Sequence, residues 1–197
     1  MMNMAKTALL VIDFVNDIVH PKGKIAANAT FIHEREVLEH ANQVIKMARQ
    51  AQFPIAHIKV GFSASYIECP MQSPLFSKAK EAGALQLGTW GTEFHEKIDV
   101  QPDDFILIKK RVSAFYATNL EAFLHAQKID SLILTGVSTD MAIQSTAREA
   151  HDRDYQVTIV EDACGAAQQI VHEHAINQLA RVSTITTAAL LNKRFKR

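Results

Sequence analysis

The sequence contains little cysteine and no excess of either charge. Two cysteines among 197 residues are too few for a disulfide framework. Lys and Arg together number 21, as do Asp and Glu, so composition gives no electrostatic argument for binding nucleic acid or an anionic membrane. No apolar run is long enough to span a bilayer, and the start lacks the apolar stretch of a signal peptide. We therefore expect a cytoplasmic protein that binds neither nucleic acid nor a membrane.

The histidines are not grouped as metal ligands usually are. Nine are scattered along the chain, and His172 and His174 lie two residues apart on a predicted helix, which places them on different faces. We therefore expect no metal site and no cofactor.

Apolar runs that alternate with segments of helical period predict an α/β fold. The length suits one domain, residues 1–197, and the alternation is typical of parallel strands joined by helical crossovers. The predicted strands are Thr7–Ile12, Ile55–Val60, Phe105–Ile108, Leu132–Thr135, Val157–Val160 and a weaker one near Val182–Ile185. Helices are predicted around Val37–Ala48, from Leu120, over Ala142–Arg153 and over Ile170–Leu179. The expected architecture is a single three-layer α/β/α, Rossmann-like domain with a mainly parallel six-stranded sheet.

Residues 61–103 interrupt this alternation. Gly, Ser and Pro are spread through the segment and its apolar stretches are brief. Long irregular insertions in compact domains usually serve as lids, binding loops or oligomer contacts. We expect this insertion to line the active site or an oligomer interface.

The candidate site residues come at the ends of predicted strands. Asp13 ends the first strand, Lys109 ends the central one, and Ala142 follows the next. Ligands of open α/β sheets bind beyond the carboxyl ends of the strands, so all three residues are predicted to face one cleft. On spacing alone, a carboxylate such as Asp13 is as suited to capping a helix or turn as to catalysis.

Ala142 stands where chemistry would favour a cysteine. The preceding strand breaks at Gly136, and a helix is predicted to begin within a few residues. In the first turn of a helix, backbone N–H groups are unpaired and the helix dipole lowers the pKa of a thiol. A methyl group offers no nucleophile.

Five segments resemble the isochorismatase-like, or cysteine hydrolase, superfamily. The family signature reads roughly G-V-x-T-x-x-C-V-x-x-T-A-x-x-A, and the segment from Gly136 to Ala150 matches it except for alanine in place of cysteine and isoleucine in place of valine. Four further matches follow the family order: Ala8–Asp17, Leu87–Gly91, Lys109–Leu120 and Val160–Cys164. The resemblance thus covers nearly the whole chain and implies the fold predicted above.

The resemblance also implies roles for individual residues. Asp13 is the expected general acid/base, and Lys109 the lysine that orients it and stabilises charge. Lys110 is the rival, but Lys109 lies four residues before the motif serine, Ser113, whereas Lys110 would point to the other face of the strand. The backbone N–H groups of Ala142 and Ser138 are the expected oxyanion donors, with a cis peptide bond between Val137 and Ser138.

Aromatic residues are candidates for the walls of the substrate pocket. Phe62, after the second strand, and Trp90, in the Gly88-Thr89-Trp90 turn, suit a small planar substrate. Phe115 and Tyr116 are further candidates, with core packing as the alternative for Phe115 and an interface as the alternative for Tyr116.

Three hypotheses account for Ala142. The first is a natural hydrolase without a nucleophilic cysteine. Isochorismatases usually have glycine at this position and use the aspartate to protonate a vinyl ether, but they carry a glutamine in the loop after the second strand, and Gly61–Tyr66 has none. The second is a cysteine amidohydrolase inactivated by a Cys-to-Ala change at position 142. The third is a non-catalytic binding or scaffold member of the family.

Two other solutions are disfavoured. Ser138, Thr139, Ser145 and Thr146 are near Ala142 in sequence, but capping and backbone hydrogen bonds explain such hydroxyls without catalysis. Nicotinamidases of the superfamily have an Asp-x-His with further histidines after the second strand, and only His57 lies in that region here. We therefore predict a hydrolase of a small carbonyl, amide or enol-ether metabolite acting through Asp13 and Lys109, and the resemblance implies a homodimer or homotetramer.

Overall fold

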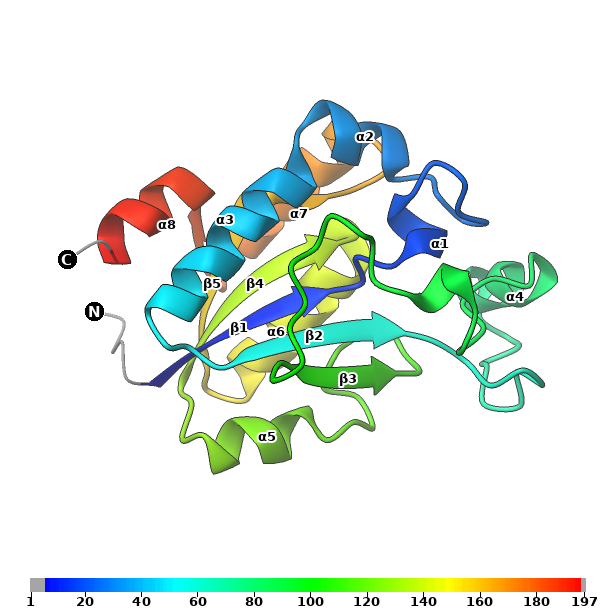
Figure 1. Cartoon of the computed structure of the whole chain (residues 1–197), viewed down its shortest axis with the longest axis horizontal. Helices are drawn as coiled ribbons and strands as arrows, with labels where there is room; N and C mark the ends of the chain where they lie inside the picture. Colours follow the sequence, from blue (N-terminus) through cyan, green and yellow to red (C-terminus); the bar gives the residue numbers. More distant parts are fainter. Residues whose placement is uncertain (1–5, 196–197) are drawn as a thin grey trace.

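Six strands, paired in parallel, form the central sheet of this computed structural model, which describes residues 6–195. The sheet order is β3-β2-β1-β4-β5-β6 (Figure 1). The strands are β1 (Thr7–Ile12), β2 (Ile55–Val60), β3 (Phe105–Lys109), β4 (Ser131–Val137), β5 (Gln156–Gly165) and β6 (Thr184–Thr186). β1 and β4 are buried along their whole lengths, as their Val-, Ile- and Leu-rich sequences predict. The predicted three-layer fold with a parallel six-stranded sheet is confirmed; the first five and last two residues of the expected 1–197 domain lie outside the described part.

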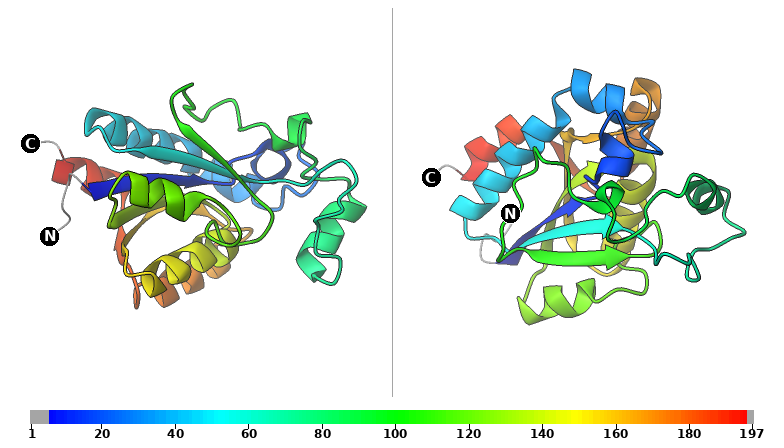
Figure 2. Two further views of the ribbon diagram at one scale, coloured as in Figure 1. Left: turned by 90° about the horizontal axis from the view of Figure 1, so that it is seen from below. Right: turned by 45° about the vertical axis from the view of Figure 1, so that its right-hand side comes forward.

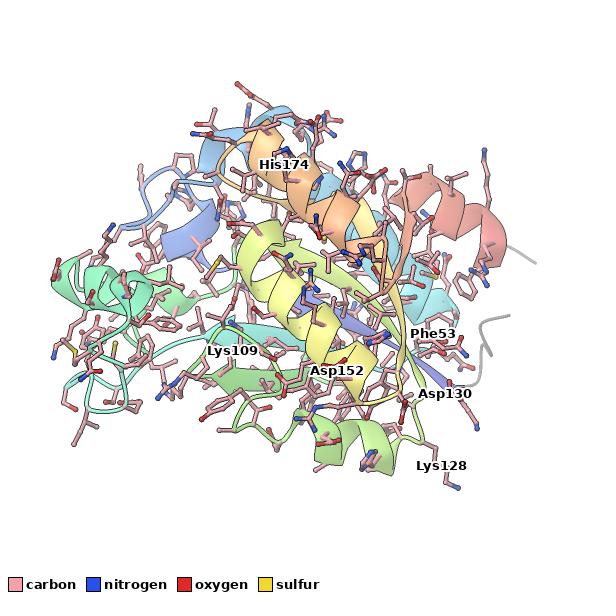
Figure 3. The ribbon with its side chains drawn as sticks, turned by 180° about the vertical axis from the view of Figure 1, so that it is seen from behind. Phe53, Lys109, Lys128, Asp130, Asp152 and His174 are labelled. Carbon is pink, nitrogen blue, oxygen red and sulfur yellow. The ribbon has the colours of Figure 1, made fainter. Side chains whose placement is uncertain are left out.

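Helices cover both faces of the sheet (Figure 2). One face packs against α2 (Ala29–Glu34), α3 (Val37–Gln50) and α8 (Ala188–Phe195). The other packs against α5 (Leu120–Ala126), α6 (Gln144–Asp152) and α7 (Gln169–Leu179). α3 is amphipathic, and its buried apolar positions follow the helical repeat from Val37 to Ala48. On α7, His174 is exposed (Figure 3). His172 is buried, so the two histidines lie on different faces of the helix as predicted.

Two elements differ from the sequence expectation at the carboxyl end of the sheet. The helix expected from Ala142 begins earlier, with the π-helical turn η3 (Thr139–Ile143) running into α6. β5 extends to Gly165 because its pairing with β4 resumes after an irregularity, with Gly136 opposite Cys164. The longer strand buries Cys164, and burial raises the pKa of its thiol, which agrees with a structural rather than a nucleophilic role.

The insertion at 61–103 is largely irregular but carries α4 (Pro74–Glu81) and the short helix η2 (Trp90–Thr92). A bridge between Phe62 and Gln86 closes the base of residues 63–85, here called the arm, which projects beyond the sheet (Figures 1 and 2). Its interior is a separate apolar cluster that includes Phe62 and Phe76. Asp17 of α1 (Asn16–Val19) anchors the arm, because its Oδ2 accepts a hydrogen bond of 2.7 Å from the N–H of Leu85.

No helix in the part from 6 to 195 is long and apolar enough to cross a membrane.

Candidate active site

Asp13 occupies the first position after β1, in a left-handed conformation with φ of 59°. Its N–H donates to the carbonyl of Ile58, and its Oδ1 accepts a hydrogen bond of 2.7 Å from the N–H of Val60. On the other side of β1, Gly136 of β4 pairs with Ile12. A Cβ at position 136 would lie 2.1 Å from the Ile12 carbonyl oxygen, so only glycine allows β4 to pass this close to the strand end that carries Asp13.

Lys109 reaches Asp13 from the end of β3. The register pairs Lys109 with Val60, the residue whose N–H already holds the Asp13 carboxylate. Lys109 Nζ lies 2.7 Å from Asp13 Oδ2 and also donates to the Arg111 carbonyl at 3.2 Å. The side chain of Lys109 runs among the buried residues at the end of the sheet (Figure 3) and is only 2% exposed.

Lys110 points away from this pair. Its ammonium group lies 2.9 Å from Glu68 and donates to the carbonyl of Gly61. The alternation of side chains along a strand therefore separates the two lysines as the sequence predicts.

Burial dominates the electrostatics of Asp13. The carboxyl group is 3% exposed, and the loss of hydration raises its pKa above the usual value of an aspartate. The positive charge of Lys109 and the N–H of Val60 oppose this shift without cancelling it. A carboxyl group with a raised pKa exchanges a proton closer to neutral pH than an exposed aspartate does, which suits general acid/base chemistry.

The turn between β4 and α6 lies beside the pair. It contains a cis peptide bond between Val137 and Ser138, as the resemblance implies. The Ser138 carbonyl accepts hydrogen bonds from the N–H groups of Met141 and Ile143, which fixes the first turn of the helix around Ala142. Ala142 itself is buried within this turn.

The hydroxyls of the turn are held by other groups. Ser138 Oγ donates to Asp140 at 2.6 Å, and Thr139 Oγ1 lies 2.9 Å from His172 Nδ1. Thr146 Oγ1 accepts a hydrogen bond from the N–H of Ala114. The expected capping and backbone roles hold only in part. The Ser138 and Thr139 hydroxyls contact side chains and Ser138 makes no side-chain cap, whereas Thr146 pairs with a backbone N–H.

A cavity of about 310 Å³ opens over these residues. Asp13, Lys109, Val137, Ser138 and Ala142 are among its lining residues. The rest of the lining is mostly apolar and comes from the 18–28 segment, the arm, Val60, Val112 and Met141. The volume suits a small metabolite.

The sequence and structure of the chain were compared with known proteins. The isochorismatase domain family matches residues 7–189. The chain belongs to the isochorismatase family. Its relatives include an uncharacterized isochorismatase family protein, YecD, of Escherichia coli O157:H7, which is 32% identical over 192 residues, covering 93% of this chain and 95% of that protein.

A curated enzyme and a solved structure are also similar to this isochorismatase-family chain. The ureidoacrylate amidohydrolase RutB of Caulobacter vibrioides is 28% identical over 170 residues, covering 80% of this chain and 76% of that enzyme. The crystal structure of a cysteine hydrolase from Pseudomonas syringae pv. phaseolicola 1448A has a TM-score of 0.88 at 21% identity, covering 99% of this chain and 94% of that one. The second likeness concerns the fold alone.

The four aromatic residues expected in the pocket lie outside the cavity lining of this isochorismatase-family chain. Phe62 turns into the apolar cluster of the arm, where its ring contacts Phe76. Trp90 is 45% exposed and packs its ring edge-on against His20. Tertiary packing, and not sequence position alone, decides whether the side chain of a loop residue faces the cavity.

Phe115 and Tyr116 were also expected in the pocket and also lie elsewhere. Phe115 belongs to the core beneath the sheet, where its ring contacts Tyr155. Tyr116, its neighbour in the chain, is 58% exposed. For Phe115 the alternative of core packing is correct.

Lining residues from the arm and from the segment before α2 were not predicted from the sequence. Leu75, Phe76, Lys78 and Ala79 of α4 line the cavity together with Asn28. One signal marks α4 in the sequence: Ser73 caps the helix by accepting from the Phe76 N–H, and Pro74 occupies its first turn. No comparable signal marks Asn28.

A second buried polar cluster lies away from the cavity. His57 of β2 contacts Asp104, which Arg49 of α3 binds through two hydrogen bonds. Burial lowers the pKa of His57, so the cluster joins α3 to the loop before β3 with a neutral imidazole. Across residues 6–195, no group of three or more His, Cys, Asp or Glu side chains is arranged to hold a metal ion.

Proposed function

We propose that this isochorismatase-family chain hydrolyses a small carbonyl, amide or enol-ether metabolite and that Asp13 and Lys109 carry the chemistry. The observation that supports this most strongly is the buried pair, with Lys109 Nζ 2.7 Å from Asp13 Oδ2, in the lining of the same cavity as Ser138 and Ala142. Burying an ion pair is costly, and strongly perturbed titratable groups in a cleft are typical of functional sites.

An acid-catalysed route needs no nucleophilic side chain. In this route the protonated carboxyl group of Asp13, whose pKa burial raises, donates its proton to the substrate, for example to the carbon of an enol ether. Water then adds to the resulting cation and returns one proton to Asp13, which leaves a tetrahedral hemiketal. The bond from this carbon to the leaving oxygen breaks as the new hydroxyl becomes a carbonyl, and the hydroxyl proton goes to the leaving oxygen as the alcohol. Lys109 remains cationic and holds the carboxylate while the proton is away. Ala142 is compatible with each of these steps.

The second candidate is a cysteine amidohydrolase whose nucleophile is missing. It is favoured by the position of Ala142, buried in the first turn of the helix and in the cavity lining, and by the similarity to an amidohydrolase. In that mechanism the Asp13 carboxylate accepts the thiol proton, the thiolate attacks the amide or ureido carbon, and the backbone N–H groups of Ala142 and Ser138 bind the oxyanion.

The third candidate is a binding protein without activity. Such a protein would have no use for a carboxylate and an ammonium group that are both desolvated, so the retained pair argues against it.

The experiment is a hydrolysis assay on a panel of small amides, ureido acids and enol ethers. The unmodified chain and Ala142→Cys are each assayed with and without Asp13→Asn. Turnover by the unmodified chain supports the acid route, and turnover by Ala142→Cys alone supports the cysteine amidohydrolase. Either activity should disappear with Asp13→Asn. Absence of turnover in all four proteins would favour the binding protein.

The small-molecule substrate is expected to bind to a homodimer or homotetramer. The arm supports this part of the proposal, because Ile67, Met71 and Leu75 leave large apolar side chains exposed. Light scattering after size-exclusion chromatography measures the mass directly, and a monomer at micromolar concentration would contradict it.

A further inference from the structure

Asn28 is a buried amide without a partner. It precedes α2 and is 8% exposed, yet its side chain makes no capping hydrogen bond and none to any other residue in the 6–195 range. It lines the cavity that contains Asp13 and Ala142. An amide offers two hydrogen-bond donors and one acceptor, and no described residue uses those of Asn28. The unused hydrogen-bonding capacity of Asn28 therefore faces the space that a ligand would fill.

Lys78 brings a free positive charge to the same cavity. It lies on α4 of the arm, its side chain is exposed, and it forms no ion pair with any described residue. The other two charged lining residues, Asp13 and Lys109, contact each other. Lys78 is thus the charged lining residue without a partner, and its charge is positive.

The remaining surface of the cavity restricts what these two residues could recognise. Ile18, Ile25, Phe76, Val112 and Met141 provide apolar walls, so a polar ligand group finds few other partners there. A carboxylate fits both unused groups, because it accepts hydrogen bonds from an amide and pairs with an ammonium ion.

We infer that Asn28 and Lys78 determine substrate specificity by binding the carboxylate of a small anionic substrate, with Asn28 donating a hydrogen bond and Lys78 supplying the opposite charge. This rests on the proposed function, in which Asp13 acts on the amide, ureido or enol-ether group of the same molecule. The substrate class is therefore a short carboxylic acid that carries a hydrolysable group at its other end.

A purely structural role for Asn28 makes a different prediction. Since no residue of the described chain depends on the Asn28 side chain for a hydrogen bond, Asn28→Ala leaves no group unpaired. The thermal unfolding midpoint of Asn28→Ala should therefore equal or exceed that of the unmodified chain. A structural role would lower it.

Ligand binding to the unmodified chain tests the inference independently of catalysis. Ala142 has no nucleophile, so the ligand forms no covalent adduct at this position. Isothermal titration calorimetry compares β-ureidopropionate with β-ureidopropionamide, its neutral counterpart, at low and high salt. We expect the acid to bind about tenfold more tightly than the amide at low salt, and this preference to shrink at high salt.

Substitution of Asn28 and Lys78 tests whether these two residues cause the tighter binding of the acid. Asn28→Ala should weaken binding of the acid by roughly tenfold or more, the loss expected for a hydrogen bond to a charged group. Lys78→Gln should remove the preference for the acid over the amide. Lys80→Gln is the matched control, because Lys80 lies on the same helix outside the cavity lining, and it should change neither affinity.

Three results would overturn the inference: no binding of the acid in the millimolar range, equal binding of acid and amide, or full affinity in both Asn28→Ala and Lys78→Gln. The proposed function can fail separately. If Ala142→Cys hydrolyses ureido compounds but substitution of Asn28 and Lys78 leaves the affinities unchanged, the proposed function is supported and the carboxylate site is refuted. If the affinities change as expected but no form of the protein hydrolyses a substrate, the carboxylate site is supported and the proposed function is refuted.

Discussion

Lys109 Nζ lies 2.7 Å from Asp13 Oδ2, and the backbone N–H of Val60 holds the other carboxylate oxygen at the same distance. The register of three neighbouring strands fixes this arrangement, since Asp13 directly follows β1, β2 supplies Val60 and β3 pairs Lys109 with Val60. The carboxyl group is therefore held at two oxygens by groups whose positions the sheet determines. This rigidity suits a residue that must exchange a proton at one place in the cavity.

Removing one member of the pair should be more costly than removing both. Asp13→Ala leaves the buried ammonium group of Lys109 unpaired, and we expect a loss of about 3–5 kcal/mol in the free energy of unfolding. Asp13→Ala combined with Lys109→Met removes both charges and should lose less than Asp13→Ala alone. Urea denaturation measures each value. A double variant as unstable as the sum of the two single variants would contradict the pairing.

The pH dependence of activity should distinguish the two hydrolytic routes. Burial raises the pKa of Asp13, so its protonation extends to higher pH than that of an ordinary aspartate. Activity that needs the neutral acid falls as pH rises through this pKa, as expected for the unmodified chain on an enol ether. Activity that needs the carboxylate falls as pH decreases through it, as expected for Ala142→Cys on an amide. Hydrolysis rates measured over a pH series for each protein show whether activity rises or falls with pH. Identical pH–rate profiles for the unmodified chain and Ala142→Cys would contradict the two roles assigned to Asp13.

The same shift has a consequence for stability. Because the folded protein binds the Asp13 proton more tightly than the unfolded chain does, the stability contributed by this proton is fully present below the unfolded pKa. It is lost as pH rises through the folded pKa. Asp13→Asn cannot titrate and should flatten this part of the pH–stability curve. Urea denaturation over a pH series tests this, and a curve that keeps its slope in the variant would assign the effect to another group.

Asp17 should control the attachment of the arm. Its carboxylate accepts hydrogen bonds from the N–H groups of Leu85 and Lys24, and the Leu85 N–H is buried. Asp17→Ala leaves that donor unsatisfied, so we expect a loss of about 1–3 kcal/mol in the free energy of unfolding and faster proteolysis within residues 63–85. Asp103→Ala, at an exposed loop position, is the control. Equal protease resistance in Asp17→Ala and in the unmodified chain would refute the anchoring role.

The cavity assignment predicts which aromatic residues affect ligand binding. Phe76 lines the cavity, whereas Phe115 is equally buried but packs in the core beneath the sheet. Phe76→Leu should change the dissociation constant of β-ureidopropionate several-fold, and Phe115→Leu should not. Calorimetric titration compares the two. A larger effect from Phe115→Leu would restore the original expectation for that residue.

Sequence periodicity was sufficient to predict the sheet and the relative placement of Asp13 and Lys109. Asp13 follows the buried strand β1 and Lys109 ends the half-exposed edge strand β3, and the alternation of side chains separates Lys109 from Lys110. The alternation of side chains along a strand does not predict how a loop such as the arm packs against the rest of the chain. Phe62 and Phe76 meet across the arm because Asp17 and the Phe62–Gln86 bridge fix its base. That long-range packing brings Lys78 to the cavity and keeps Phe62 out of it.

The most direct test of the central claim is the rate of ammonia release from β-ureidopropionate by Ala142→Cys, with and without Asp13→Asn. The account predicts turnover by Ala142→Cys and a loss of roughly a hundredfold or more when Asp13→Asn is added, as for removal of a general acid/base. Circular dichroism should show that both variants are folded. Undiminished turnover in the folded double variant would contradict the assignment of catalysis to Asp13 and Lys109.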